Sequence, residues 1–520
     1  PDSMTITTFR SLMGSKPSLT LELDGHTADA GINTRIDAAL DIIKNYRKIN
    51  RNNNIPEENE FTPATIRLEG GKSCFVSSDG DIVPLNDKRV KILIPSMGDL
   101  SAALFAASFR SYGINAIQMP EGSPEILKYA RANATGKECL PLLLCAGSLI
   151  YYIENEWNGK DYIASFIIQG AGNCRVGQYP VFLREMINRK KIRNVATLAL
   201  SNEDAFAGMG AHLDLRLIQV ILAADVLEDI RTAIMANAAE PEKGLEIFKE
   251  EYSKLVLDAE KQPEKFFKAL KKFSKAIKEK VPAKINIKDS KYIALVGEIY
   301  VRREHFSHKW LNKYFAKKGF ILKEAHISEW IFYVDYLIEK GLLEPDKSRK
   351  NRRDRFIRKK YMHYAEWRIK SILSRSGYYK YSKIDIEPLL NHSKHIIPLE
   401  YKGEPGLTLG VTMHEVIEKY CGIINLGPFG CMPTRFAESV CIPETKIENK
   451  IYAKRLNNPN YSLPAIFNDK MTLPFLTIET DGNVFPQVIE ARLETFTLQA
   501  ERIAKLVDEM KLNGNSTFKN

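Results

Sequence analysis

The middle of the chain alternates between short apolar runs and longer segments with apolar residues every three or four positions. The short runs are typical of buried strands, and they occupy residues 90–95, 115–119, 162–169 and 195–200. The longer segments predict amphipathic helices over residues 99–112, 124–134, 141–157 and 180–190. Strands that alternate with helices in this way predict a mostly parallel sheet with helices on both faces.

The alternation stops near residue 200 and restarts near residue 290. The stretch between predicts two long amphipathic helices, residues 213–235 and 244–280. The second set has strand-like runs at 292–296, 320–322 and 475–478, and helical patterns at 310–318, 329–340, 350–375 and 486–510. We therefore expect an α/β fold of two Rossmann-like lobes, with parallel sheets around a central cleft and with helical insertions.

These patterns divide the chain into four expected parts. A small β-rich linker segment is expected at 51–88, the first α/β lobe at 88–290, and the second lobe, with its basic helical insertion, at 291–520. Residues 1–50 are expected to be the end of an upstream α/β repeat unit, because residues 17–25 match residues 474–482 in type and spacing. The chain is then expected to be a piece of a longer protein.

Composition places the chain among ordinary globular proteins. Of its 520 residues, 44% are hydrophobic and 27% are charged, which is ample material for buried cores. No stretch approaches the roughly 18 uninterrupted apolar residues of a membrane helix, and no basic-apolar leader opens the sequence. Seven cysteines are too few for a disulfide scaffold. We expect a cytoplasmic protein with reduced thiols and no membrane contact.

The net charge of +11 is concentrated in two basic segments, residues 261–291 and 347–360. Such segments either bind anions such as nucleic acid, nucleotide or coenzyme A, or form the solvated faces of helices. The second interpretation is favoured because it needs no partner. No zinc-finger, RNA-recognition or basic-zipper pattern accompanies the charge, so nucleic acid is not an expected partner.

Three cysteines lie where an α/β fold places ligands, in loops after strands and at helix starts. Cys139, Cys174 and Cys431 are each flanked by glycine or proline, which lets the backbone approach a bulky inorganic group. Zinc usually takes clustered cysteine pairs, which the sequence lacks, and catalysis by cysteine needs one thiolate and a base. An iron–sulfur cluster with one open or non-cysteine position fits better, and buried core cysteines are the alternative.

The surroundings of these cysteines resemble a known family. Residues 88–510 are similar to the 2-hydroxyacyl-CoA dehydratase subunit family, in its activase-related, ATPase-fused branch, and to the related double-cubane cluster reductases. The motifs that carry this resemblance are Gly136-Lys-Glu-Cys139-x-Pro141, Gly172-x-Cys174-Arg175-x-Gly177-Gln178-Tyr179, Val296-Gly297-Glu298-Ile299-Tyr300-Val301-Arg302, Glu329-Trp330, Gly427-Pro-Phe-Gly-Cys431-Met-Pro433 and the tail from Glu479 to Arg492. Residues 24–35 resemble the linking region of the ATPase-fused members.

The resemblance implies two α/β lobes around a cleft that holds a cysteine-bound cluster. It makes Cys139, Cys174 and Cys431 the ligands of a [4Fe-4S] cluster. An [8Fe-9S] double cubane would need three more cysteines, and core packing is the favoured role of the three candidates, Cys145, Cys421 and Cys441. No ligand role is expected for Cys74 or for the histidines His212, His305, His308 and His414.

Two classes of function follow from the resemblance. In the first, the protein is an enzyme that accepts low-potential electrons from an ATP-hydrolysing iron–sulfur activase and performs reductive or radical chemistry on an acyl-CoA or another small molecule. Glu298 and Arg302, after a strand of the second lobe, are then the candidate catalytic residues. In the second, the protein is a non-catalytic electron relay within a larger activase complex.

The activase is expected to be a separate chain or a missing upstream segment. The phosphate-binding glycine motifs of its ATPase module do not occur in this sequence, so the chain is not expected to hydrolyse ATP itself. The two basic segments have no counterpart that we can place in the family. Whether the protein forms a homodimer stays open.

Overall fold

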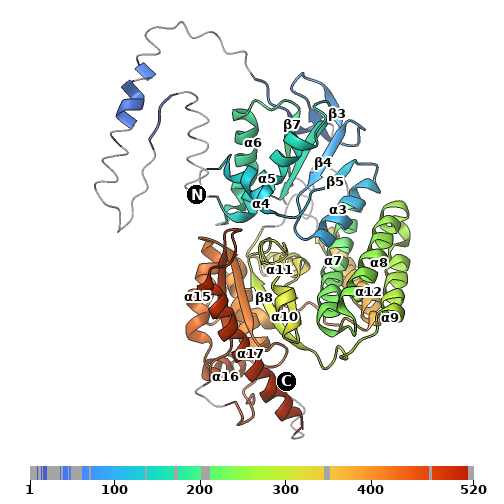
Figure 1. Ribbon diagram of the computed structural model, residues 1–520, viewed down its shortest axis with the longest axis vertical. Coiled ribbons are helices and arrows are strands. Elements are labelled where there is room, and N and C mark those ends of the chain that lie inside the picture. The colour runs from blue at the N-terminus through green and yellow to red at the C-terminus, as the bar shows by residue number, and fades with distance from the viewer. Residues whose placement is uncertain are drawn as a thin grey trace.

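The computed structural model describes residues 61–69, 72–134, 138–168, 174–200, 211–344, 352–467 and 471–512, together with isolated positions between 9 and 47. Its framework is two four-stranded sheets, and the strands within each sheet are parallel. Helices flank both sheets, which lie one above the other in Figure 1. The predicted α/β fold with two Rossmann-like lobes is confirmed. Most of the N-terminal repeat, including Asp24 and Arg35, lies outside the described residues.

The first lobe is built on a sheet with the strand order β5-β4-β6-β7. Its strands are β4 (Val90–Ile94), β5 (Ala116–Gln118), β6 (Tyr162–Ile168) and β7 (Val195–Leu200). The helices around it are α3 (Asp99–Arg110), α4 (Pro124–Arg131), α5 (Leu140–Asn155) and α6 (Tyr179–Arg189). Six of the seven residues of β6 are buried, because helices cover both faces of a parallel sheet.

A small antiparallel sheet packs against the first lobe. Its strands β1 (Thr65–Glu69), β2 (Lys72–Val76) and β3 (Ile82–Pro84) pair in sequence order. Phe75 of β2 stacks on Tyr162 at the start of β6, with ring centroids 5.2 Å apart, and the Tyr162 hydroxyl donates to Asp81. The β-rich segment that was expected before the first lobe is therefore in direct contact with it.

The second lobe is built on a sheet with the strand order β11-β10-β8-β9. Its strands are β8 (Lys291–Gly297), β9 (Phe320–Glu324), β10 (Ile423–Pro428) and β11 (Phe475–Thr480). The helices around it are α10 (Leu311–Lys317), α11 (Ile327–Glu339), α13 (Ile386–Ser393), α14 (Glu404–Glu415), α15 (Met432–Glu444), α16 (Ile447–Arg455) and α17 (Gln487–Leu512).

Strand β10 is not among the predicted elements. All six of its residues are buried, so the polar–apolar alternation that marks a half-exposed strand is missing. Cys421 lies two residues before β10, and its N–H donates to the carbonyl of Tyr292 in β8.

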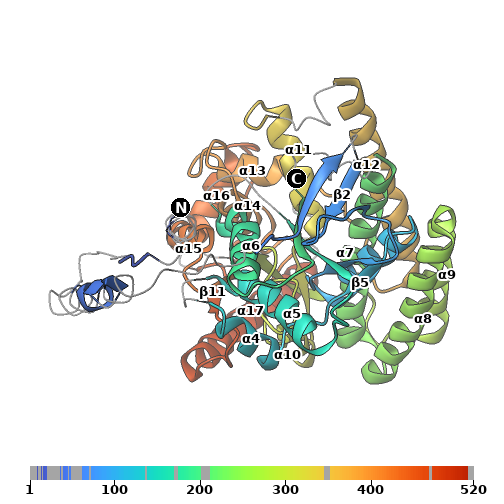
Figure 2. The same ribbon diagram turned by 90° about the horizontal axis from the view of Figure 1, so that it is seen from above.

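A layer of helices lies beside the two sheets (Figure 2). It consists of α7 (Ala211–Asn237), α8 (Pro241–Lys261), α9 (Phe266–Lys280) and α12 (Arg352–Leu373). Helix α7 packs on α3 of the first lobe and on α10 and β9 of the second. The single helix predicted over 244–280 is wrong: the chain breaks at Gln262, because Pro263 cannot donate a hydrogen bond within a helix.

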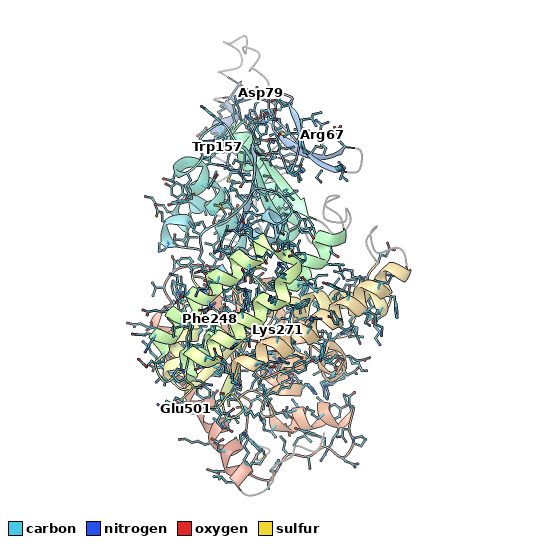
Figure 3. All side chains as sticks on the ribbon, turned by 90° about the vertical axis from the view of Figure 1, so that its right-hand side faces the viewer. Arg67, Asp79, Trp157, Phe248, Lys271 and Glu501 are labelled. Atoms are coloured by element: carbon cyan, nitrogen blue, oxygen red, sulfur yellow. The ribbon has the colours of Figure 1, made fainter. Side chains whose placement is uncertain are left out.

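Two helices of this layer, α9 and the start of α12, carry described parts of the basic segments. Phe266, Leu270 and Phe273 on α9 are buried against the neighbouring helices, while the lysines of the same helix point to solvent. Lys271 on α9 is labelled in Figure 3, which views the layer face on. The lysine-rich segment is thus the solvated face of an amphipathic helix.

The carboxyl ends of both sheets meet at the junction of the lobes. Glu121, which follows β5, lies 2.8 Å from Nδ1 of His305, which follows β8. Arg131, at the end of α4, donates to the carbonyl of Asp481, which follows β11 (3.2 Å). In open α/β sheets this edge is where ligands bind. No helix in the described ranges is both long enough and apolar enough to cross a membrane.

Candidate functional site

Cys139, Cys174 and Cys431 share one local position, the N-cap of a helix. Cys139 precedes α5, Cys174 precedes the short 3₁₀ helix η1 (Arg175–Gln178), and Cys431 precedes α15. All three have extended backbones, with φ of −74°, −77° and −71°. The first two lie at the carboxyl edge of the first sheet and the third follows β10, so both lobes contribute.

One of the three sulfurs accepts a cap hydrogen bond. The N–H of Val176 donates to Sγ of Cys174 over 3.5 Å, whereas Cys139 and Cys431 make no side-chain cap hydrogen bond. The nearby N–H groups of Leu142 and Thr434 still lower the pKa of Cys139 and Cys431 in part. An N-cap sulfur with such donors is preorganised to carry negative charge.

Burial has the opposite and larger effect on these thiols. It raises the pKa of Cys139, and it raises the pKa of Cys174 and Cys431 to about 12. The side chain of Cys174 is solvent-exposed, so solvent screens this effect most at that thiol. The free thiols are therefore neutral at pH 7, and a bound metal would displace their protons.

Glu298 links the three cysteines electrostatically. Its carboxylate raises the thiol pKa of Cys139, Cys174 and Cys431, so all three lie within reach of the same charge. Oε2 of Glu298 accepts the N–H groups of Tyr300 and Val301, which fixes the side chain at the end of β8. Burial nevertheless raises the pKa of Glu298 to about 7.

Arg302 acts on the backbone rather than on the cysteines. Its guanidinium donates to the carbonyls of Gly297 (2.6 Å), Ala325 (3.1 Å) and His326 (3.3 Å). Only 5% of Arg302 is exposed, and burial lowers its pKa. This side chain ties the ends of β8 and β9 together, so it is a positioning residue for the loop that carries Glu298.

Two residues that sequence reasoning did not select complete the surroundings of the cysteines. The hydroxyl of Tyr179 lies 2.9 Å from Sγ of Cys139. Glu404, at the start of α14, raises the thiol pKa of both Cys174 and Cys431. Tyr179 belongs to the motif around Cys174, which could have drawn attention to it, whereas Glu404 lies in a segment without a recognised motif.

The three further candidate cysteines are dispersed. Cys145 lies two turns into α5, and the charge of Cys139 raises its pKa, so these two are neighbours. Cys421 precedes β10 and lies at the opposite end of this strand from Cys431, roughly 20 Å away by the rise of a strand. Cys441 is fully buried in a separate apolar cluster with Leu409 and Met413. The structure brings only Cys145 toward the three N-cap cysteines.

The spacing of the sulfurs bears on the type of metal site. A single zinc ion would hold its thiolates about 3.8 Å apart, as follows from Zn–S bonds of about 2.3 Å in a tetrahedron. Among the described residues, no three cysteine sulfurs lie within 4.8 Å of one another. The described residues therefore hold no preformed zinc site of three thiolates.

A cavity of about 560 Å³ lies on the α13 and α14 side of the second sheet. Glu329, from the Glu329-Trp330 motif, lines it, together with His392, His414 and Lys454. The charges of Glu329 and Glu298 both raise the pKa of Arg302, so this arginine lies within reach of both carboxylates.

Comparisons of the chain with protein-family models, with curated proteins and with solved structures find no match.

Proposed function

We propose that the protein binds an iron–sulfur cluster through Cys139, Cys174 and Cys431 and accepts low-potential electrons from an ATP-hydrolysing activase. One observation carries the proposal. Cysteines from both lobes, up to 292 residues apart in sequence, all occupy the N-cap of a helix, and the carboxylate of Glu298 raises the thiol pKa of each. The family resemblance of the flanking motifs supports the same ligand set.

The residues of this chain would have distinct tasks. The three thiolates would hold the cluster, and the N–H groups of the first helical turns would stabilise their charge. A bound cluster supplies one-electron transfer, and an open iron can act as a Lewis acid. Glu298, with a pKa of about 7, is poised to hold or release a proton beside it, and Arg302 keeps the Glu298 loop in place. The substrate class is an acyl-CoA or another small molecule.

The surface beside Cys431 favours a transient partner. Phe429 is 71% exposed and Met432 is 42% exposed, and both flank this cysteine. Exposed apolar side chains next to a redox site are suited to brief docking of an electron donor. All seven cysteines are unpaired, which fits a reducing cytoplasm as the place of action.

Anaerobic isolation tests the cluster directly. We expect the reconstituted protein to contain iron and acid-labile sulfide in equal amounts, with the ratio of a [4Fe-4S] cluster. Colourless protein after reconstitution without oxygen would contradict the proposal.

The rate at which the cluster is reduced tests whether an activase is the electron donor. We expect reduction of the cluster to need an activase and ATP, and to slow as ionic strength rises, because charge-steered docking is screened by salt. Full reduction by a simple ferredoxin without ATP would leave the electron-relay function instead.

A further inference from the structure

Helix α12 presents a stripe of exposed aromatic side chains that the proposed function does not use. Phe356 is 61% exposed, Tyr364 is 41% exposed and Trp367 is 55% exposed. Their spacing places the three rings on one side of the helix, opposite the buried Met362 and Ile369. Large aromatic side chains are mostly buried in proteins, so a row of them on one solvated face indicates a binding surface.

Two cations lie among these rings. Nζ of Lys360 is 5.5 Å from the ring centroid of Phe356, and the guanidinium carbon of Arg368 is 5.6 Å from that of Tyr364. Arg368 also donates to the hydroxyl of Tyr364. Within the described part of the chain, neither cation forms an ion pair with a carboxylate. Both charges are therefore available to an anionic partner.

The neighbouring helix α9 extends this surface. The ring centroid of its Phe267 lies 6.5 Å from that of Tyr364, and the guanidinium carbon of Arg368 lies 4.5 Å from the Phe267 centroid. Figure 3 shows α9 and α12 side by side, with Lys271 labelled one turn beyond Phe267. Lys271 is exposed and has no ion pair with any described residue. The aromatic-basic surface consists of Phe356, Lys360, Tyr364, Trp367, Arg368 and Lys271.

The mixture of rings and cations on one face fits one class of partner. A helix that lies on a membrane keeps its apolar residues apart from its cations, and the core of a protein–protein interface contains few lysines. Single-stranded nucleic acid has a negative backbone and flat bases, so its phosphates can contact lysine and arginine while its bases stack on aromatic rings. Charge alone suits the solvated face of a helix, whereas the exposed rings favour a ligand.

We propose that the aromatic-basic surface binds single-stranded nucleic acid without sequence preference. Trp367 and the other rings stack on bases, while Lys360, Arg368 and Lys271 neutralise phosphates. From Phe356 to Arg368 the stripe is about 18 Å long at the rise of an α-helix, which gives room for several nucleotides. The surface belongs to the helical layer and includes none of the cysteines, so the proposal stands whether or not a cluster is bound.

Fluorescence anisotropy of a labelled oligo(dT) of about 12 nucleotides, titrated with the full chain, tests the proposal. We expect saturable binding that weakens as the salt concentration rises, because binding releases counterions. Trp367→Ala should raise the Kd at least about fivefold, whereas Trp367→Phe, which keeps a flat ring, should raise it less. Lys271→Ala should lower the slope of log Kd against log salt by about 0.7, the value for one phosphate of a single strand.

Tyr452→Ala is the matched control, since Tyr452 on α16 is also an exposed aromatic residue (59%) but lies outside the surface. It should leave the Kd unchanged, and thermal melting shows which variants fold. Folded Trp367→Ala protein with an unchanged Kd would overturn the proposal.

Two other ligands distinguish the alternatives. Heparin is a polyanion without bases, so Trp367→Ala should leave its affinity nearly unchanged, and equal losses for heparin and oligo(dT) would contradict base stacking. Binding to vesicles of phosphatidylcholine and phosphatidylserine without binding to oligo(dT) would identify a membrane-binding helix and overturn the proposal.

Discussion

The cysteine site differs in construction from a second region between the same two lobes, which we call the charged junction and which consists of Asp99, Asp225, Glu228, Glu324, Arg231 and Arg303. The charged junction pairs most of its charges internally: Arg231 with Asp99 and Glu228, and Arg303 with Asp225 and Glu324. The cysteine site holds neutral thiols whose pKa burial has raised. A site of neutral thiols contributes little to folding and is available for a ligand, whereas a network of buried ion pairs contributes to the way the lobes fit together.

The largest expected effect concerns the ligand at the cysteine site. Cys431→Ala removes the only cysteine that the second lobe supplies to this site, so nearly all bound iron and sulfide should be lost after anaerobic reconstitution. The free energy of unfolding of the metal-free protein should change by less than about 1 kcal/mol, because Cys431 is only partly buried and its sulfur makes no cap hydrogen bond. Cys74→Ala is the control and should retain its iron; equal losses from both variants would show that Cys431 is not a ligand.

At the charged junction, a substitution should lower the free energy of unfolding. Arg303→Met leaves Asp225 and Glu324 buried without their cation, and we expect the free energy of unfolding to fall by about 3–5 kcal/mol. Arg193→Met is the control, since Arg193 and its partner Asp79 are both more than half exposed, and it should cost at most about 1 kcal/mol. Denaturant titration measures both values. Similar losses in the two variants would contradict a special role of the buried network.

The smallest expected effect concerns Glu298 and is pH-dependent. In metal-free protein, Glu298→Gln removes the negative charge that raises the pKa of Cys174, so more thiolate forms and alkylation of this exposed cysteine should be about two to three times faster at pH 8. Because the pKa of Glu298 is about 7, the difference should appear above pH 7 and vanish below pH 6. A pH-independent ratio of the two rates would show that Glu298 acts through packing.

Local patterns predicted the lobes better than the sites between them. The run predicted at 195–200 is β7, and the helix starts at Cys139 and Cys431 follow from glycine and proline nearby in the sequence. The contacts of His305 with Glu121 and Arg231 were not predicted. Glu121 and His305 follow different strands and Arg231 lies on a separate helix, so their meeting depends on how the lobes pack, which no periodicity encodes.

The order of the strands also has a consequence for synthesis on the ribosome. The first sheet is complete once β7 ends at Leu200, but the second sheet pairs β10 with β11, which ends at Thr480. At translation rates of about 5–20 residues per second, the 280 residues between these points take about 14–56 s to appear. During that interval the nascent first lobe can fold and present Cys139 and Cys174 before β10, which precedes Cys431, has paired with β11. A chain stalled in this interval would expose these two thiols to oxidants, and under the proposed function cluster loading would be a late event.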